Sequence, residues 1–345
     1  MRSGWHNGDD GSGGTPPGKP PSTMRDEEDA GVPGLLSAME GFFIIGVVIA
    51  VGYVAARFHV GGPTAQLVLN KYSFFVSTPC LMFAILSKQK LSVIFHPSII
   101  VAFLSAAAVG LLFVALNATS FHLPAAEATI GALDALYLNS NNIGLPVATY
   151  ILGNPTLVAP ILVMQQALFT PIGLTVLDAT TSGRLSVKTI LKQPLKQPIL
   201  IGSLGGIVIS AISAQAGHFV IPDFVYKPID MIGQSAVPMI LMAFGMSLRG
   251  SRPMGRGTDR RATLCAVILK NLVMPIIAYL LARFMMGFSG AELYGCVVLA
   301  ALPTGQNVYN YAARYGVGTT FARDAILLST ISSPVIIALV ALLLS

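Results

Sequence analysis

Apolar stretches separated by short polar segments fill almost the whole chain after residue 34. A helix needs roughly 20 apolar residues to cross a bilayer core about 30 Å thick. Stretches of that length predict ten membrane-spanning helices, at residues 35–57, 64–86, 97–118, 125–151, 157–178, 198–217, 226–248, 262–287, 290–313 and 319–343. The hydrophobic pattern therefore predicts an all-α polytopic membrane protein.

The first 34 residues have a different character. They are rich in glycine and proline and end in an acidic run, and they lack the apolar stretch that follows the basic start of a secretory signal. Such a segment cannot bury enough apolar surface to offset its chain entropy. We expect a disordered N-terminal tail over residues 1–34, and translation from Met24 would remove most of it.

Composition supports the membrane interpretation. Hydrophobic residues make up 54% of the 345 residues and charged residues only 10%, whereas soluble domains carry about 25% charged residues. The net charge of +6 comes with no nucleic-acid-binding motif, and membrane proteins gain Lys and Arg in cytoplasmic loops. Cys80, Cys265 and Cys296 lie in apolar segments without disulfide or zinc spacing. We expect lipid surroundings, no nucleic acid, no metal and no cofactor.

Two basic loops predict the orientation. The loops after the fifth and seventh predicted helices lie on one side of the membrane and together hold nine basic residues, which are Arg184, Lys188, Lys192, Lys196, Arg249, Arg252, Arg256, Arg260 and Arg261. Such loops face the cytoplasm. With ten spans, both termini then lie outside the cytoplasm, and the cell membrane is the expected location.

The basic loop at 179–197 divides the chain into two blocks of five helices, 35–178 and 198–345. Because five is odd, a second copy of the block enters the membrane upside down, which is the inverted repeat of many secondary transporters. Weak internal symmetry supports this hypothesis, since Ser77 and Pro79 in the second helix correspond to Ser235 and Pro238 in the seventh. The glycine pair Gly202 and Gly206 fits packing between helices of the chain better than dimerisation.

The fourth helix of each block contains residues that break helices. Amides, a glycine and a proline lie near mid-membrane in 139–146 and again in 303–307. Proline removes a backbone donor, and irregular backbone at that depth persists only where it is buried in protein or lines a wet cavity. Two breaks that meet would bring helix N-termini and amides together, an arrangement that favours an anion. The predicted substrate-binding residues are Asn139, Ser140, Asn142, Gly144, Pro146, Pro303, Gly305, Gln306 and Asn307. The alternative is that the prolines are kinks and the amides only join packed helices.

Four motifs carry a family resemblance. They are Asn139-Ser140 with Gly144 and Pro146; Ala301-Leu302-Pro303-Thr304-Gly305 with Arg314 and Tyr315; Asn70-Lys71 with Pro79; and Lys270 with Pro275. In this order, over 35–345, the chain resembles the auxin efflux carrier family, which includes the plant PIN-FORMED carriers and many bacterial members. The long loop of the plant carriers is absent, so the chain is similar to the bacterial, short-loop members.

The resemblance implies a ten-helix inverted repeat related to sodium/proton antiporters and bile-acid symporters, in which helices four and nine cross at their prolines. It also implies export of a small organic anion such as a carboxylic acid, and a homodimer. The family commonly has a glutamine in the fifth helix, which adds Gln165 and Gln166 to the predicted site. The Asn141-Asn142 pair departs from the apolar residues of plant members, which puts auxin itself in doubt.

We expect two ionisable residues to lie at membrane depth, Asp134 about nine residues into the fourth predicted helix and Lys270 about eight residues into the eighth. A charge at membrane depth costs several kcal/mol unless it is paired or hydrated. We expect Asp134 to couple transport to a proton or cation, or to pair with Lys270. The alternative is a side chain that reaches water at the helix end.

Other functions lack their motifs. Gly287-Phe288-Ser289-Gly290 matches the nucleophile motif of rhomboid proteases, but no histidine lies within a predicted helix to act as its base. The chain also lacks an ATP-binding GxxxxGK[ST] loop and an HExxH motif, so we expect no enzyme. The alternatives to an anion carrier are a channel, a non-transporting membrane scaffold and a sodium-coupled symporter.

Overall fold

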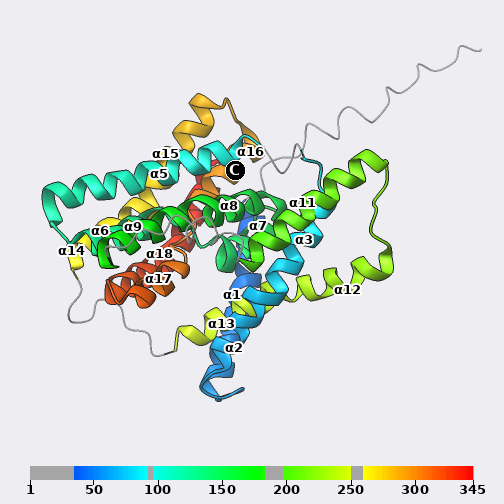
Figure 1. Ribbon diagram of the computed structural model, residues 1–345, viewed down its shortest axis with the longest axis horizontal. Coiled ribbons are helices and arrows are strands. Elements are labelled where there is room, and N and C mark those ends of the chain that lie inside the picture. The colour runs from blue at the N-terminus through cyan, green and yellow to red at the C-terminus, as the bar shows by residue number, and fades with distance from the viewer. Residues whose placement is uncertain (1–34, 92–95, 183–196, 250–258, 345) are drawn as a thin grey trace, which may run out of the picture. The chain divides into compact units, whose positions relative to one another are not determined.

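The computed structural model describes residues 35–91, 96–182, 197–249 and 259–344 (Figure 1). Within these ranges the chain is helical, and the only β feature is one isolated bridge. The predicted tail at 1–34 and most of the basic loop at 179–197 lie outside the described residues.

The helices follow the predicted windows closely. In the first half they are α1 (Leu35–Arg57), α2 (Ala65–Tyr72), η1 (Ser73–Ser77), α3 (Thr78–Ser87), α5 (Ser98–Leu116), η2 (Asn117–Phe121), α6 (Ala125–Leu136), η3 (Ser140–Gly144), α7 (Leu145–Tyr150), η4 (Pro155–Val158), α8 (Ala159–Met164), η5 (Gln165–Phe169) and α9 (Thr170–Ser182). In the second half they are α11 (Pro198–Ala216), α12 (Asp223–Gln234), α13 (Ala236–Ser247), α14 (Arg260–Ile268), η7 (Leu269–Val273), α15 (Met274–Leu280), η8 (Leu281–Met285), α16 (Gly290–Ala300), α17 (Asn307–Tyr315) and α18 (Thr319–Leu344).

Seven continuous helical segments in the described ranges are long and apolar enough to cross a membrane, at 65–87, 98–121, 155–181, 198–216, 223–247, 260–285 and 319–344. Two predicted windows, 125–151 and 290–313, are each divided by a non-helical stretch and so fail the length criterion. Large apolar side chains such as Leu111, Ile201 and Phe284 are exposed on the helix surfaces. Water would penalise such surfaces and lipid does not, so the chain is a multi-pass membrane protein.

Four wide π-helical turns each come just before a proline. In η1, η3, η5 and η7 the residue that precedes the proline donates its N–H five residues back instead of four. The prolines are Pro79, Pro146, Pro171 and Pro275. The ring of a proline clashes with the carbonyl four residues back and supplies no donor, and a wider turn accommodates it. The sequence thus bends its long helices without ending them.

The helices pack mainly in two groups. In the first, α1 packs along α13 and α3 packs along α11, with α2 and α12 beside them. In the second, α5, α6, α8, α9 and α14 to α18 pack largely among themselves. The buried apolar core lies mostly in this second group, and so do most of the buried polar side chains.

Glycines allow close backbone contact in the first group. A Cβ added at Gly202 or Gly206 would collide with the backbone of α3 at Pro79 or Phe83. Gly52 of α1 and Gly245 of α13 lie equally close to one another's helices. The prediction that the Gly202–Gly206 pair serves packing within the chain is confirmed.

Candidate functional site

The two broken segments cross each other in extended conformation. Leu138 and Thr304 face each other across the isolated antiparallel bridge. The Asn139 N–H donates to the Pro303 carbonyl at 2.8 Å, and the Gly305 N–H donates to the Tyr137 carbonyl at 2.9 Å. Each segment therefore supplies partners for backbone groups that the other lost when its helix ended.

The side chain of Gln165, in the π turn η5, acts as a further partner for the crossing. Its amide oxygen accepts from the Leu138 N–H at 2.6 Å, and its amide nitrogen donates to the Leu138 carbonyl at 3.1 Å and to the Ser140 hydroxyl at 2.6 Å. An unpaired buried polar group costs about 1–3 kcal/mol. The buried Gln165 side chain thus supplies hydrogen-bond partners for the unwound backbone of the first broken helix.

Polar side chains of α18 and η7 form hydrogen bonds with backbone groups of the second broken segment. The Ser329 hydroxyl accepts from the Thr304 N–H at 3.1 Å, and the Ser333 hydroxyl donates to the Ala301 carbonyl at 2.7 Å. The Lys270 ammonium donates to the Ala300 carbonyl at 2.9 Å. Ala300 is the last residue of α16, so Lys270 supplies a donor to a carbonyl at the C-terminal end of that half-helix.

Asp134 lies deep in α6 and is fully buried, as is Lys270. Its backbone carbonyl accepts from the Thr304 hydroxyl at 2.7 Å, which ties it to the crossing. Both carboxylate oxygens lack a hydrogen-bond partner among the described residues. The ion pair with Lys270 considered from the sequence is not among the ion pairs of the described residues. Neither side chain reaches the surface, so snorkelling to water does not account for them.

A row of amides links the two broken helices on one side of the crossing. The Asn141 amide donates to the Asn142 side-chain oxygen at 2.8 Å, and the Asn142 amide donates to the Gln306 side-chain oxygen at 3.1 Å. The next residue, Asn307, donates to the Tyr137 hydroxyl at 3.5 Å. These amides lie at the N-terminal ends of the second half-helices, where backbone N–H groups and the helix dipole are positive.

The amide row lines a cavity of about 1000 Å³. Its walls come from α2, η1, η3, the start of α11, α13, α17 and α18. Three cationic residues, Lys71, Arg249 and Arg323, line it, and no acidic residue is among the described residues that do. Arg323 donates to the carboxylate of the adjacent Asp324 at 2.8 and 2.9 Å, and Arg249 donates to the Ala56 carbonyl and contacts His59 at 3.3 Å. The polar side of the cavity is therefore positive.

The structure separates the predicted site residues into two sets. Asn142, Gln306 and Asn307 line the cavity. The others do not line it and lie around the crossing or farther inside the protein; they are Asn139, Ser140, Gly144, Pro146, Gln165, Gln166, Pro303 and Gly305. Gly305 is needed for close approach, because a Cβ there would meet the Tyr137 ring at 2.9 Å and the Leu138 carbonyl at 3.0 Å.

Two buried amides in the crossing keep unpaired atoms. Asn139 accepts from the Asn142 N–H at 3.2 Å, but its amide nitrogen has no partner among the described residues. The side-chain oxygen of Gln166 also has no hydrogen-bond partner among the described residues. Buried groups of this kind are rare and are often found at functional sites.

The cationic lining was not predicted from the sequence. Lys71 was used only as part of a motif, Arg249 was counted with the basic loop, and Arg323 was not considered. Lys71 lies about seven residues into its predicted helix, nearly as deep as Lys270, so the rule that singled out Lys270 would have found it too, whereas Arg323 lies close to the start of its predicted helix.

The chain is similar in sequence to known transport proteins. The profile of the membrane transport protein family matches residues 37–341. The chain is 24% identical over 306 residues to an "Uncharacterized transporter" of Methanocaldococcus jannaschii, covering 87% of this chain and 97% of that protein. It is also 24% identical over 295 residues to a "Putative malonate transporter" of Rhizobium meliloti, covering 83% of this chain and 89% of that protein. The family match spans nearly the whole chain, and the protein therefore belongs to the membrane transport protein family, the family of auxin efflux carrier-like proteins.

Proposed function

We propose that the protein is a secondary transporter that exports a small organic anion, such as a carboxylic acid, across the cell membrane by alternating access. The observation that carries the proposal is the amide row of Asn142, Gln306 and Asn307 at the wall of a cavity lined by cations. Amides and helix N-termini bind a carboxylate without burying a fixed counter-charge against it, and Lys and Arg side chains attract it into the cavity.

We propose ten spans in two inverted halves. Two helix pairs join the halves, since α1 of the first half packs on α13 of the second, and α3 of the first half packs on α11 of the second. The corresponding residues Ser77 and Ser235 also contact each other, with 2.9 Å between their hydroxyl oxygens. Equivalent residues meet in this way where they lie close to a two-fold axis. The divided windows 125–151 and 290–313 then each count as one span whose interruption is the crossing.

The cavity opens toward the cytoplasm in this proposal. Gln197 and Pro198 line it and directly follow one basic loop, while Leu248 and Arg249 line it and directly precede the other. Since basic loops favour the cytoplasmic side, the protein is open to the cytoplasm in this state, and both termini lie outside. An export carrier would load its anion from this cavity.

Malonate is a suitable first substrate to test because of the name that the Rhizobium meliloti relative carries. Purified protein in liposomes would be given radiolabelled malonate, with succinate, benzoate and acetate as further acids. We expect saturable flux of at least one acid. Asn142→Ala should reduce that flux about tenfold, because the amide at the wall is lost. The matched control is Gln234→Ala, an exposed amide of α12 that bonds to Asp230 and does not line the cavity.

The alternatives give different results in the same assay. Flux that rises linearly with concentration would indicate a channel, and flux that needs external sodium would indicate a symporter. No flux of any acid, with the protein correctly folded, would overturn the transporter proposal in favour of a scaffold.

A further inference from the structure

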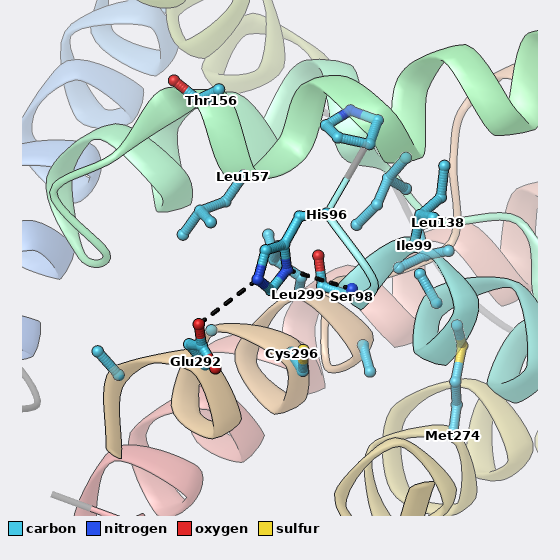
Figure 2. Close-up of a pocket in the computed structure, with 16 residues that line it drawn as sticks. His96, Ser98, Ile99, Leu138, Thr156, Leu157, Met274, Glu292, Cys296 and Leu299 are labelled. Carbon is cyan, nitrogen blue, oxygen red and sulfur yellow. Dashed lines mark hydrogen bonds and ion pairs between the residues drawn. The ribbon is translucent and has the colours of Figure 1, made fainter. Parts of the chain in front are cut away.

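A second hollow approaches the crossing from the other side. It has a volume of about 350 Å³ and lies between the N-terminal part of α5, the η4–α8 segment and α16 (Figure 2). Leu138 and Ala300 form part of its wall, so it reaches the crossing itself. A volume of this size is at the lower end of ligand pockets, which are roughly 300–1,000 Å³.

The wall of this pocket is mainly apolar. Its apolar side chains include those of Ile99, Leu157, Pro160, Ile161, Met274 and Leu299. Ala300, the last residue of α16, lines the pocket, so the C-terminal end of that half-helix lies here. No Lys or Arg is among the residues that line the pocket. An anion would therefore find no counter-charge, in contrast to the cavity on the other side.

The polar side chains that line the pocket are those of His96 and Glu292, together with the hydroxyl-bearing Ser98 and Thr156. The Nδ1 atom of His96 accepts from the Ser98 N–H at 3.3 Å, which leaves Nε2 to carry the proton. Nε2 lies 3.4 Å from a carboxylate oxygen of Glu292, and Figure 2 shows the two side chains turned toward each other across the hollow. The imidazole also lies beside the Phe288 ring, with 5.5 Å between centroids. The Glu292 carboxylate is half-exposed and keeps lone pairs that can accept further hydrogen bonds.

From this lining we propose that the pocket binds a small uncharged molecule, apolar over most of its surface, with one hydrogen-bond donor directed at Glu292. Benzyl alcohol is a suitable probe because it has one apolar ring and one hydroxyl donor. Benzoate is its anionic counterpart of nearly the same size. The site is distinct from the cavity of the proposed anion, and its test needs no transport activity.

Cys296 lines the pocket and provides a reporter. N-ethylmaleimide alkylates its thiol by adding the sulfur across the ring double bond and a proton to the neighbouring carbon. A protein that keeps only Cys296, made by Cys80→Ala and Cys265→Ala, would be labelled in lipid nanodiscs. A matched protein that keeps only Cys265, which is outside the pocket, reports any general effect of benzyl alcohol on the bilayer.

We expect benzyl alcohol to slow the modification of Cys296 about fivefold at about four times its dissociation constant, by occupancy of the site. The rate at Cys265 should not change, and benzoate should protect neither cysteine. Gly295→Leu should remove the protection, because a Cβ at Gly295 meets Leu157 only at ordinary contact distance, 3.6 Å, and a longer side chain fills the hollow.

Three results would overturn the proposal. They are equal slowing at both cysteines, equal protection by benzoate, and failure of N-ethylmaleimide to reach Cys296 at all. Because labelling is the readout, loss of the proposed transport function would leave this result unaffected.

Discussion

The glycine-packed helix pairs and the crossing are held together in opposite ways. In the pairs α1–α13 and α3–α11, the backbones approach so closely that even a methyl group has no room at Gly52, Gly202 or Gly245. At the crossing, the backbone leaves the helix and is held by side chains from other helices, chiefly Gln165, Ser329 and Lys270. One region depends mainly on close packing and the other on polar partners.

This difference follows from the surroundings of each region. Helices that meet lipid gain little from hydrophobic burial, so close van der Waals packing of small residues joins them. Extended backbone inside the protein must instead satisfy its N–H and carbonyl groups locally. Polar partners of that kind are compatible with a cavity, which explains why the amide row and the cavity lie beside the crossing and not within the glycine-packed pairs.

The largest expected effect is at the glycine contacts. Gly245→Val would force the α13 backbone away from Ile49 of α1, and overpacking of this kind costs about 1–3 kcal/mol or more. We expect a lower melting temperature and less monodisperse protein in detergent. Gly46→Val is the matched control in α1, because a Cβ at Gly46 meets nothing within 4 Å. Equal losses in both variants would show that the pairs do not depend on close contact.

Gln165→Leu should have the next largest effect. The change leaves the Leu138 N–H without its partner, at about 1–3 kcal/mol, while the Ser140 hydroxyl still donates to the Leu138 carbonyl at 3.5 Å. The neighbouring Gln166→Leu removes an amide oxygen that has no partner among the described residues, so it should be tolerated much better. Thermal unfolding of both proteins measures the difference. A similar stability for the two variants would mean that the crossing does not depend on Gln165.

A smaller effect is expected from the cationic lining. Lys71→Gln should raise the KM for the transported anion about fivefold and leave the maximal rate nearly unchanged, since an exposed charge mainly attracts the ligand. The control is Lys227→Gln, whose ammonium pairs with Asp223 at 3.3 Å and does not line the cavity. An unchanged KM in Lys71→Gln, or an equal rise in both variants, would contradict a positive binding cavity.

The smallest effect on stability is expected from Asp134→Asn, together with a change in the pH dependence of transport. The carboxyl group is buried without a hydrogen-bond partner among the described residues, so a neutral amide of the same shape should be accepted. If Asp134 couples transport to a proton, flux should vary with pH in the unmodified protein and lose this dependence in the variant. Flux measured at several pH values decides it, and retention of the full pH dependence would exclude Asp134 as the coupling group.

The amino-acid sequence determined the membrane class, nearly all helix positions and the two breaks, because apolar length, proline and glycine act locally. The positions of Pro79, Pro146, Pro171 and Pro275 also fix the four wide turns, although the turns themselves were not predicted. The family followed from four short motifs in a consistent order.

Only the tertiary structure decided which polar residues serve the backbone and which face open space. Gln165 and Asn142 both carry amides near the breaks. The Gln165 side chain hydrogen-bonds to the backbone of Leu138, whereas Asn142 lines the cavity. Lys71, Arg249 and Arg323 come from three distant segments and share a wall only after folding. Helix breaks are local properties of the chain, whereas the lining of a cavity depends on contacts between residues far apart in sequence, and a single sequence does not encode those in any short pattern.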